Sequence, residues 1–99
     1  MKIDVLYFQG CPNHLPAVAL AKEVVAGLGI TAQIQELQIA TPTQAVEHRF
    51  LGSPSIHVNG LDIDPNAKAR TDYSFSCRMY GQSPLPTKEM LQTAITNNT

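Results

Sequence analysis

The sequence Tyr7-Phe8-Gln9-Gly10-Cys11-Pro12-Asn13-His14 separates two different patterns. Before it, residues 2–8 form a short β-branched and aromatic run that is apolar on both faces apart from one aspartate, which is typical of a central strand in an α/β sheet. After it, apolar residues recur at three- and four-residue steps from Leu15 to Leu28, as on a buried helix face. Gly10 and Pro12 interrupt the strand, so Cys11 is expected at or just before a helix N-terminus.

A thiol at a helix N-terminus has an environment that favours its anion. The unsatisfied backbone N–H groups and the positive end of the macrodipole lie there. Such placement can lower a cysteine pKa from about 8.5 into the range of roughly 3.5–7.5. We therefore predict a reactive thiolate at Cys11, with the imidazolium of His14, one helical turn on, as a possible second stabilising charge. The alternative interpretation is a buried structural cysteine and a solvated histidine.

The next segment predicts a strand over residues 31–39. Ala32 and Ile34 alternate with polar residues, and the phase then slips before Leu37 and Ile39. We interpret the slip as a β-bulge near Gln35 and Glu36. Strand, helix and strand with short links imply a right-handed crossover and a parallel pair of strands.

The second half of the chain contains clear start and turn signals. Thr41 and Pro42 predict a helix that carries Ala45, Val46, Arg49 and Phe50. Residues 55–58 read as a third strand, and the Asn59-Gly60 turn returns residues 61–64 antiparallel to it. Thr87 caps a last helix, whereas residues 64–86 give no clear element. His57, Asp62 and Asp64 are interpreted as strand residues on a solvated face.

Composition restricts the class of protein. The 99 residues allow one domain, 1–99, and 43% apolar with 15% charged residues fits a compact globule. The net charge is −1 without a clustered basic face, so nucleic acid is not an expected partner. Two cysteines are too few for a disulfide scaffold, and no zinc-type spacing occurs, so no metal or cofactor is expected. No signal peptide or membrane span is recognisable, which predicts a cytoplasmic protein with free thiols and no membrane partner.

The predicted order is β-α-β-α-β-β-α, with a mixed four-stranded sheet and helices on both faces. Together with the segments 10–13, 52–60 and 73–80, this order resembles small bacterial thioredoxin-like proteins, some of which are named alkylmercury-lyase-like. The resemblance implies a cis peptide bond before Pro54, which would face Cys11. It also implies that Pro12, Ser53 and Pro54 bind the substrate, Ser53 by pairing its backbone with an extended peptide or with glutathione.

One residue departs from the redox motif of that family. His14 stands where the second cysteine of Cys-x-x-Cys would be, so a mixed disulfide on Cys11 cannot be resolved within the motif. Three alternatives remain: Cys77 resolves the mixed disulfide, an external thiol such as glutathione resolves it, or there is no redox cycle.

The leading hypothesis is a thiol–disulfide protein with Cys11, His14 and Cys77 as catalytic residues. Its partner would be a protein disulfide or a low-molecular-weight thiol. One alternative is a non-catalytic thioredoxin-like binding module. Another is soft-metal or organomercurial binding by the two thiolates, provided that they lie close together.

Overall fold

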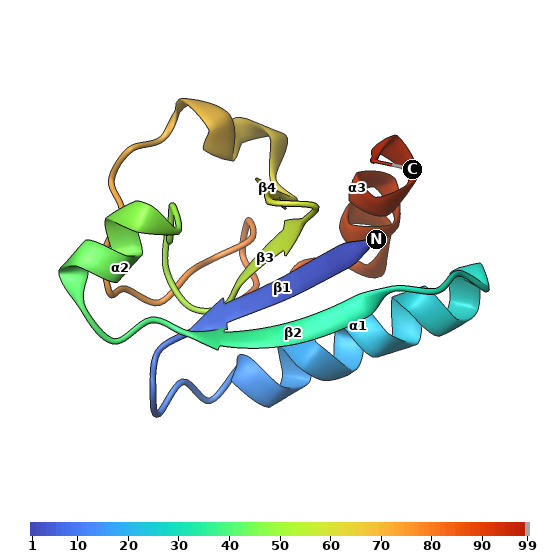
Figure 1. Ribbon diagram of the computed structural model, residues 1–99, viewed down its shortest axis with the longest axis horizontal. Coiled ribbons are helices and arrows are strands. Elements are labelled where there is room, and N and C mark those ends of the chain that lie inside the picture. The colour runs from blue at the N-terminus through green and yellow to red at the C-terminus, as the bar shows by residue number, and fades with distance from the viewer. Residues whose placement is uncertain (99) are drawn as a thin grey trace.

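The computed structural model describes residues 1–98, except for the side chain of Lys68. Its elements follow the predicted order, with one additional 3-10 helix, η1 (Figure 1). The bounds are β1 Lys2–Tyr7, α1 His14–Leu28, β2 Gln33–Gln38, α2 Pro42–Glu47, β3 Ser55–Val58, β4 Leu61–Asp62, η1 Pro65–Ala69 and α3 Lys88–Asn97. The prediction of an α/β fold with a mixed four-stranded sheet is confirmed.

The sheet has the order β2-β1-β3-β4, with β1 and β2 parallel and the other neighbours antiparallel. The predicted bulge in β2 is wrong, because its register against β1 continues without interruption from Gln33 to Gln38. The slip in the apolar pattern has another cause. Ile34 packs against the core on one face of the sheet, whereas Leu37 packs against the core on the other face.

Helices cover both faces of the sheet, as predicted. Successive strand residues point to opposite faces, so Val5 and Leu6 of β1 enter different cores. Val5 lies in the larger core with residues of α1 and α3, and Leu6 lies in the smaller core with Ala45 of α2 and Phe50. Figure 1 shows α1 along one side of the sheet and α2 near the end where β1 and β2 finish.

The second helix is shorter than the sequence pattern predicts. The Thr41 hydroxyl accepts a hydrogen bond from the Gln44 N–H, which confirms the predicted cap. The helix ends at Glu47, and Arg49 has a left-handed φ of 52°. Arg49 and Phe50 therefore do not lie on α2, and Phe50 instead turns into the smaller core.

The third strand begins after a cis peptide bond between Ser53 and Pro54, as the resemblance implied. The Asn59-Gly60 turn has φ values of 51° and 85°, the positive pair that a type I′ hairpin requires. The fourth strand stops at Asp62, earlier than predicted, because the Asp62 side chain accepts a hydrogen bond from the Asp64 N–H and turns the chain. Among the described residues, no helix has the length and apolar character to cross a membrane.

Candidate functional site

Cys11 lies in the turn that joins β1 to α1, where the sequence places it. Gly10 has φ of 90°, and the Cys11 N–H donates to the Phe8 carbonyl at 3.2 Å. The Cys11 carbonyl accepts from the N–H of His14, the first residue of α1, at 3.4 Å. The thiol is free and the residue half-buried, and Pro12 beside it is exposed. Cys11 is thus half-buried and lies three residues before the first residue of α1.

His14 does not pair with Cys11. Its ring stacks on Tyr7 with centroids 3.5 Å apart, and its Nε2 lies 2.6 Å from Oε1 of Glu36. Tyr7 and Glu36 come from neighbouring strands and share a face of the sheet, because Val5 is opposite Glu36 in the register. The structure therefore gives His14 a carboxylate partner that the sequence reasoning missed. The wrongly predicted bulge at Gln35 and Glu36 obscured this contact, because it left the register of β2 against β1 undefined at Glu36.

Ser53 and Pro54 are both buried, and Ser53 is already bonded to another part of the chain. The Ser53 N–H donates to the Ser76 carbonyl at 2.8 Å, and the Ser53 carbonyl accepts from the Arg78 N–H at 3.0 Å. Strand addition by a substrate would use these same two backbone groups. In this structure, residues 76–78 occupy the predicted substrate-binding position.

Cys77 is brought to the same end of the molecule as Cys11. It stands opposite Ser53 in a parallel bridge, and the Ser53 hydroxyl accepts a 3.4 Å hydrogen bond from the Phe8 N–H, in the turn that holds Cys11. The Cys77 thiol is free and exposed. The alternative interpretation, a small residue packed in the core, is therefore wrong. Phe75 and Met79, which flank it in sequence, are also exposed.

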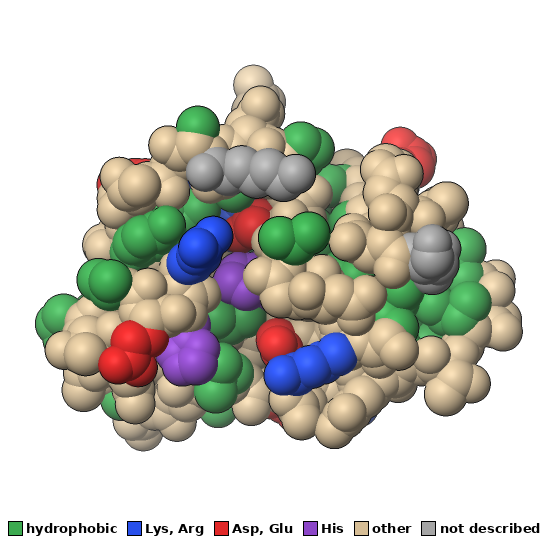
Figure 2. Space-filling model, turned by 45° about the horizontal axis from the view of Figure 1, so that its top comes forward, with side chains coloured by type: hydrophobic (Ala, Val, Ile, Leu, Met, Phe, Trp, Pro, Cys, Tyr) green, Lys and Arg blue, Asp and Glu red, His purple; other side chains and the backbone are tan. Residues whose placement is uncertain are grey.

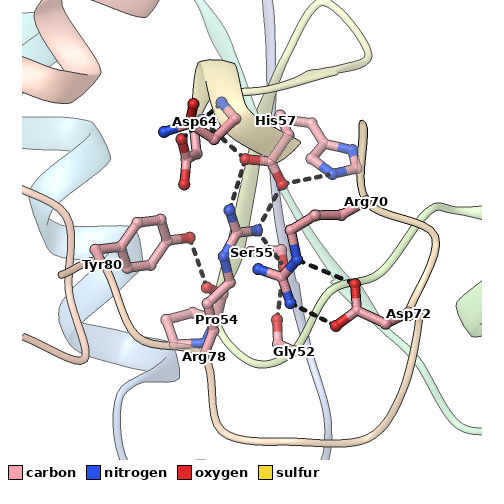
Figure 3. A network of polar contacts seen from close by, with 11 residues as sticks. Gly52, Pro54, Ser55, His57, Asp64, Arg70, Asp72, Arg78 and Tyr80 are labelled. Atoms are coloured by element: carbon pink, nitrogen blue, oxygen red, sulfur yellow. Dashed lines mark hydrogen bonds and ion pairs between the residues drawn. The ribbon is translucent and has the colours of Figure 1, made fainter. Parts of the chain in front are cut away.

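A buried ion pair anchors the segment that carries Cys77. Arg78 is only 3% exposed, and its guanidinium donates to both carboxylate oxygens of Asp62, at 2.5 and 2.8 Å (Figure 3). It also donates to the Ser55 hydroxyl at 3.0 Å and lies 4.7 Å from the centre of the Tyr80 ring. The Tyr80 hydroxyl in turn donates to the Pro54 carbonyl at 2.7 Å. This polar cluster fixes residues 77–80 against the start of β3.

Asp62 and Arg78 each stabilise the charged form of the other. Burial by itself would raise the pKa of Asp62, but the interactions with His57 and Arg78 outweigh it and lower this pKa to about 2. Burial would lower the pKa of Arg78, but Asp62 raises it. Burial raises the pKa of the Tyr80 hydroxyl. Asp62 and Arg78 are therefore a permanent ion pair at neutral pH.

The prediction that His57 and Asp62 lie on a solvated face is wrong. Residue 57 is 7% exposed, and the side chain of residue 62 is 11% exposed. The segment from η1 to Tyr80, which gave no clear pattern in the sequence, covers them with Ala67 and Arg78. The two-residue turn does imply that these two residues are opposite each other, as the register shows. Nothing in the sequence indicates that Arg78 joins them.

Within residues 1–98, no group of three or more histidine, cysteine, aspartate or glutamate side chains is arranged to hold a metal ion. No protein-family model matches the chain, and no curated protein or solved structure matches it significantly.

Proposed function

We propose that this is a thiol–disulfide protein of thioredoxin-like fold, with Cys11 as the nucleophile and Cys77 as the resolving thiol. The observation that carries the proposal is the pairing of Cys77 with Ser53, next to the turn that holds Cys11. Both thiols are free, and neither is fully buried. The order of elements and the order of strands in the sheet support the thioredoxin-like assignment.

The proposed reaction uses two exchange steps. The Cys11 thiolate attacks one sulfur of a disulfide, forms a mixed disulfide, and releases the first thiolate of the substrate. The Cys77 thiolate then attacks the Cys11 sulfur and releases the second thiolate. The substrate disulfide is reduced by two electrons, and the Cys11 and Cys77 thiols are oxidised to a disulfide. Closure requires that the two Cα atoms come within roughly 7 Å.

The contacts of His14 and Ser53 limit the roles that these two residues can have in the proposed reaction. Glu36 holds the His14 ring, so we assign no proton transfer between His14 and Cys11. Residues 76–78 occupy the backbone groups of Ser53, which leaves no pairing site there for an extended peptide. The same contacts leave no pairing site there for the backbone of glutathione. The proposed exchange therefore does not use backbone pairing at Ser53, and its substrate is a protein disulfide or the disulfide of a low-molecular-weight thiol such as glutathione.

Mass spectrometry after treatment with glutathione disulfide tests this proposal, with Cys11→Ser and Cys77→Ser as matched variants. The wild-type chain should lose two hydrogens and carry no glutathione, because Cys77 resolves the adduct. The Cys77→Ser variant should keep one glutathione on Cys11. The Cys11→Ser variant should react far more slowly. Equal modification rates in the two variants, or a wild-type chain that keeps glutathione on both thiols, would contradict the assignment.

A further inference from the structure

A small pocket lies beside the polar cluster, and neither cysteine is among its lining residues. Its volume is about 50 Å³, and it is lined by the β3–β4 hairpin, the chain between α2 and β3, and the chain after Asp64. Figure 2 shows this face of the molecule, with a histidine side chain visible in a hollow between basic and hydrophobic side chains. The lining includes Arg49, Leu51, His57, Leu61, Asp62 and Tyr73.

The pocket contains a buried ring nitrogen without a hydrogen-bond partner. The His57 side chain is 8% exposed, and its Nε2 has no hydrogen-bond partner among the described residues. Oδ2 of Asp62 lies 3.7 Å from this nitrogen, within ion-pair distance but too far for a hydrogen bond. A buried ring nitrogen left in this state costs free energy. A ligand group that bonds to Nε2 would remove that cost.

The charges around the pocket favour an anion. Asp62 is the acidic residue in the lining, and Arg78 holds both of its oxygens, so this charge is compensated. Arg49 is the basic residue of the lining, and its side chain makes no hydrogen bond or ion pair with the described residues. Because Arg78 compensates the charge of Asp62, Arg49 is the uncompensated charge among the described lining residues. A metal cation would be repelled by Arg49 and would find only two possible ligand side chains, His57 and Asp62, among the described lining residues.

The size of the pocket limits the ligand. A water molecule needs roughly 10–15 Å³ of such volume, so the pocket accommodates the equivalent of about three to five water-sized groups. Leu51 and Leu61 supply apolar walls for a short aliphatic end. A carboxylate with one or two carbon atoms matches both requirements.

We propose that this pocket is a binding site for a small carboxylate anion. The carboxylate accepts a hydrogen bond from the Nε2–H of His57 and forms an ion pair with Arg49. The apolar end of the ligand lies against the leucine side chains. The site is independent of both cysteines.

Titration of the ¹⁵N-labelled protein with sodium acetate at constant ionic strength tests the proposal, with acetamide as the neutral probe of the same shape. Acetate should cause saturable shifts of the amide resonances of Gly60, Leu61 and Ala67, with millimolar affinity. Acetamide should bind at least about tenfold more weakly, the scale expected for loss of a charge-assisted interaction.

Two matched variants separate the site from general adsorption of anions. Arg49→Gln should weaken acetate binding about tenfold, again the loss of one charge-assisted contact. Arg70→Gln, at an arginine paired with Asp72 outside the pocket lining, should leave the affinity unchanged. Shifts that do not saturate, equal effects of the two variants, or equal binding of acetamide would overturn the proposal.

Discussion

Replacing Arg78 by methionine should destabilise the protein severely. The substitution keeps an apolar stem of similar length but removes the two hydrogen bonds to Asp62 and leaves that carboxylate buried without its partner. Removing one member of a buried ion pair costs about 3–5 kcal/mol. A domain of this size is stable by about 5–15 kcal/mol, so this loss is a large fraction of the free energy of unfolding. At about 4–8 °C per kcal/mol, the melting temperature should fall by roughly 12–40 °C.

Urea denaturation followed by circular dichroism measures the change, and the chain supplies its own control. Arg70 and Asp72 form a second two-pronged pair with similar distances, but their side chains are 44% and 66% exposed. Arg70→Met should therefore cost less than about 1 kcal/mol. Combining Arg78→Met with Asp62→Leu should recover most of the loss, since no buried charge then remains. A cost for Arg78→Met as small as that for Arg70→Met would refute the reasoning.

Three further predictions concern acid, the Ser53 backbone and a helix cap. Folding lowers the pKa of Asp62 from 3.8 to about 2, so ionised Asp62 contributes about 2 kcal/mol to the free energy of unfolding. This contribution is complete above about pH 4 and is lost as the pH falls through about 2. Urea midpoints measured against pH should show this loss in the wild type, and Asp62→Asn should lack it. Gly52→Ala would place a Cβ 2.9 Å from the Ser76 carbonyl oxygen at a residue with φ of 119°. We expect the free energy of unfolding to fall by roughly 1–3 kcal/mol and the Ser53 amide to exchange its hydrogen faster. An unchanged exchange rate would contradict this. Thr87→Ala removes the hydroxyl that accepts a hydrogen bond from the Met90 N–H, and a thermal melt should show a stability loss of about 1 kcal/mol. An unchanged melting temperature would show that Thr87 does not cap α3.

The order of elements was predictable because its signals are local. The apolar periodicity of α1, the threonine caps of α2 and α3, and the Asn59-Gly60 turn each depend on a few neighbouring residues. The bulge in β2 was wrongly predicted because periodicity alone does not reveal that a strand contributes to two cores. The same strand then placed Glu36 beside His14, a contact between residues 22 positions apart.

The candidate site was predictable only in part. Cys11 was placed correctly because glycine and proline mark the turn before the helix. The polar cluster depends on Arg78, which reaches Asp62 across 16 positions from a segment without periodicity. Such a contact follows from the path of the chain in three dimensions. For the same reason, the sequence did not indicate that residues 76–78 cover Ser53.

The anchoring of residues 76–78 also determines how reagents meet the exposed thiol. One hydrogen bond donated by Ser53 and one accepted by it hold the backbone immediately before and after Cys77, and the side chain of Arg78 is buried. A thiol on a backbone that is hydrogen-bonded on both sides should be open to attack along a narrow range of directions, since disulfide exchange needs the three sulfur atoms in line. Bulky and compact reagents should therefore differ in rate at Cys77 far more than they would at a cysteine in a mobile loop.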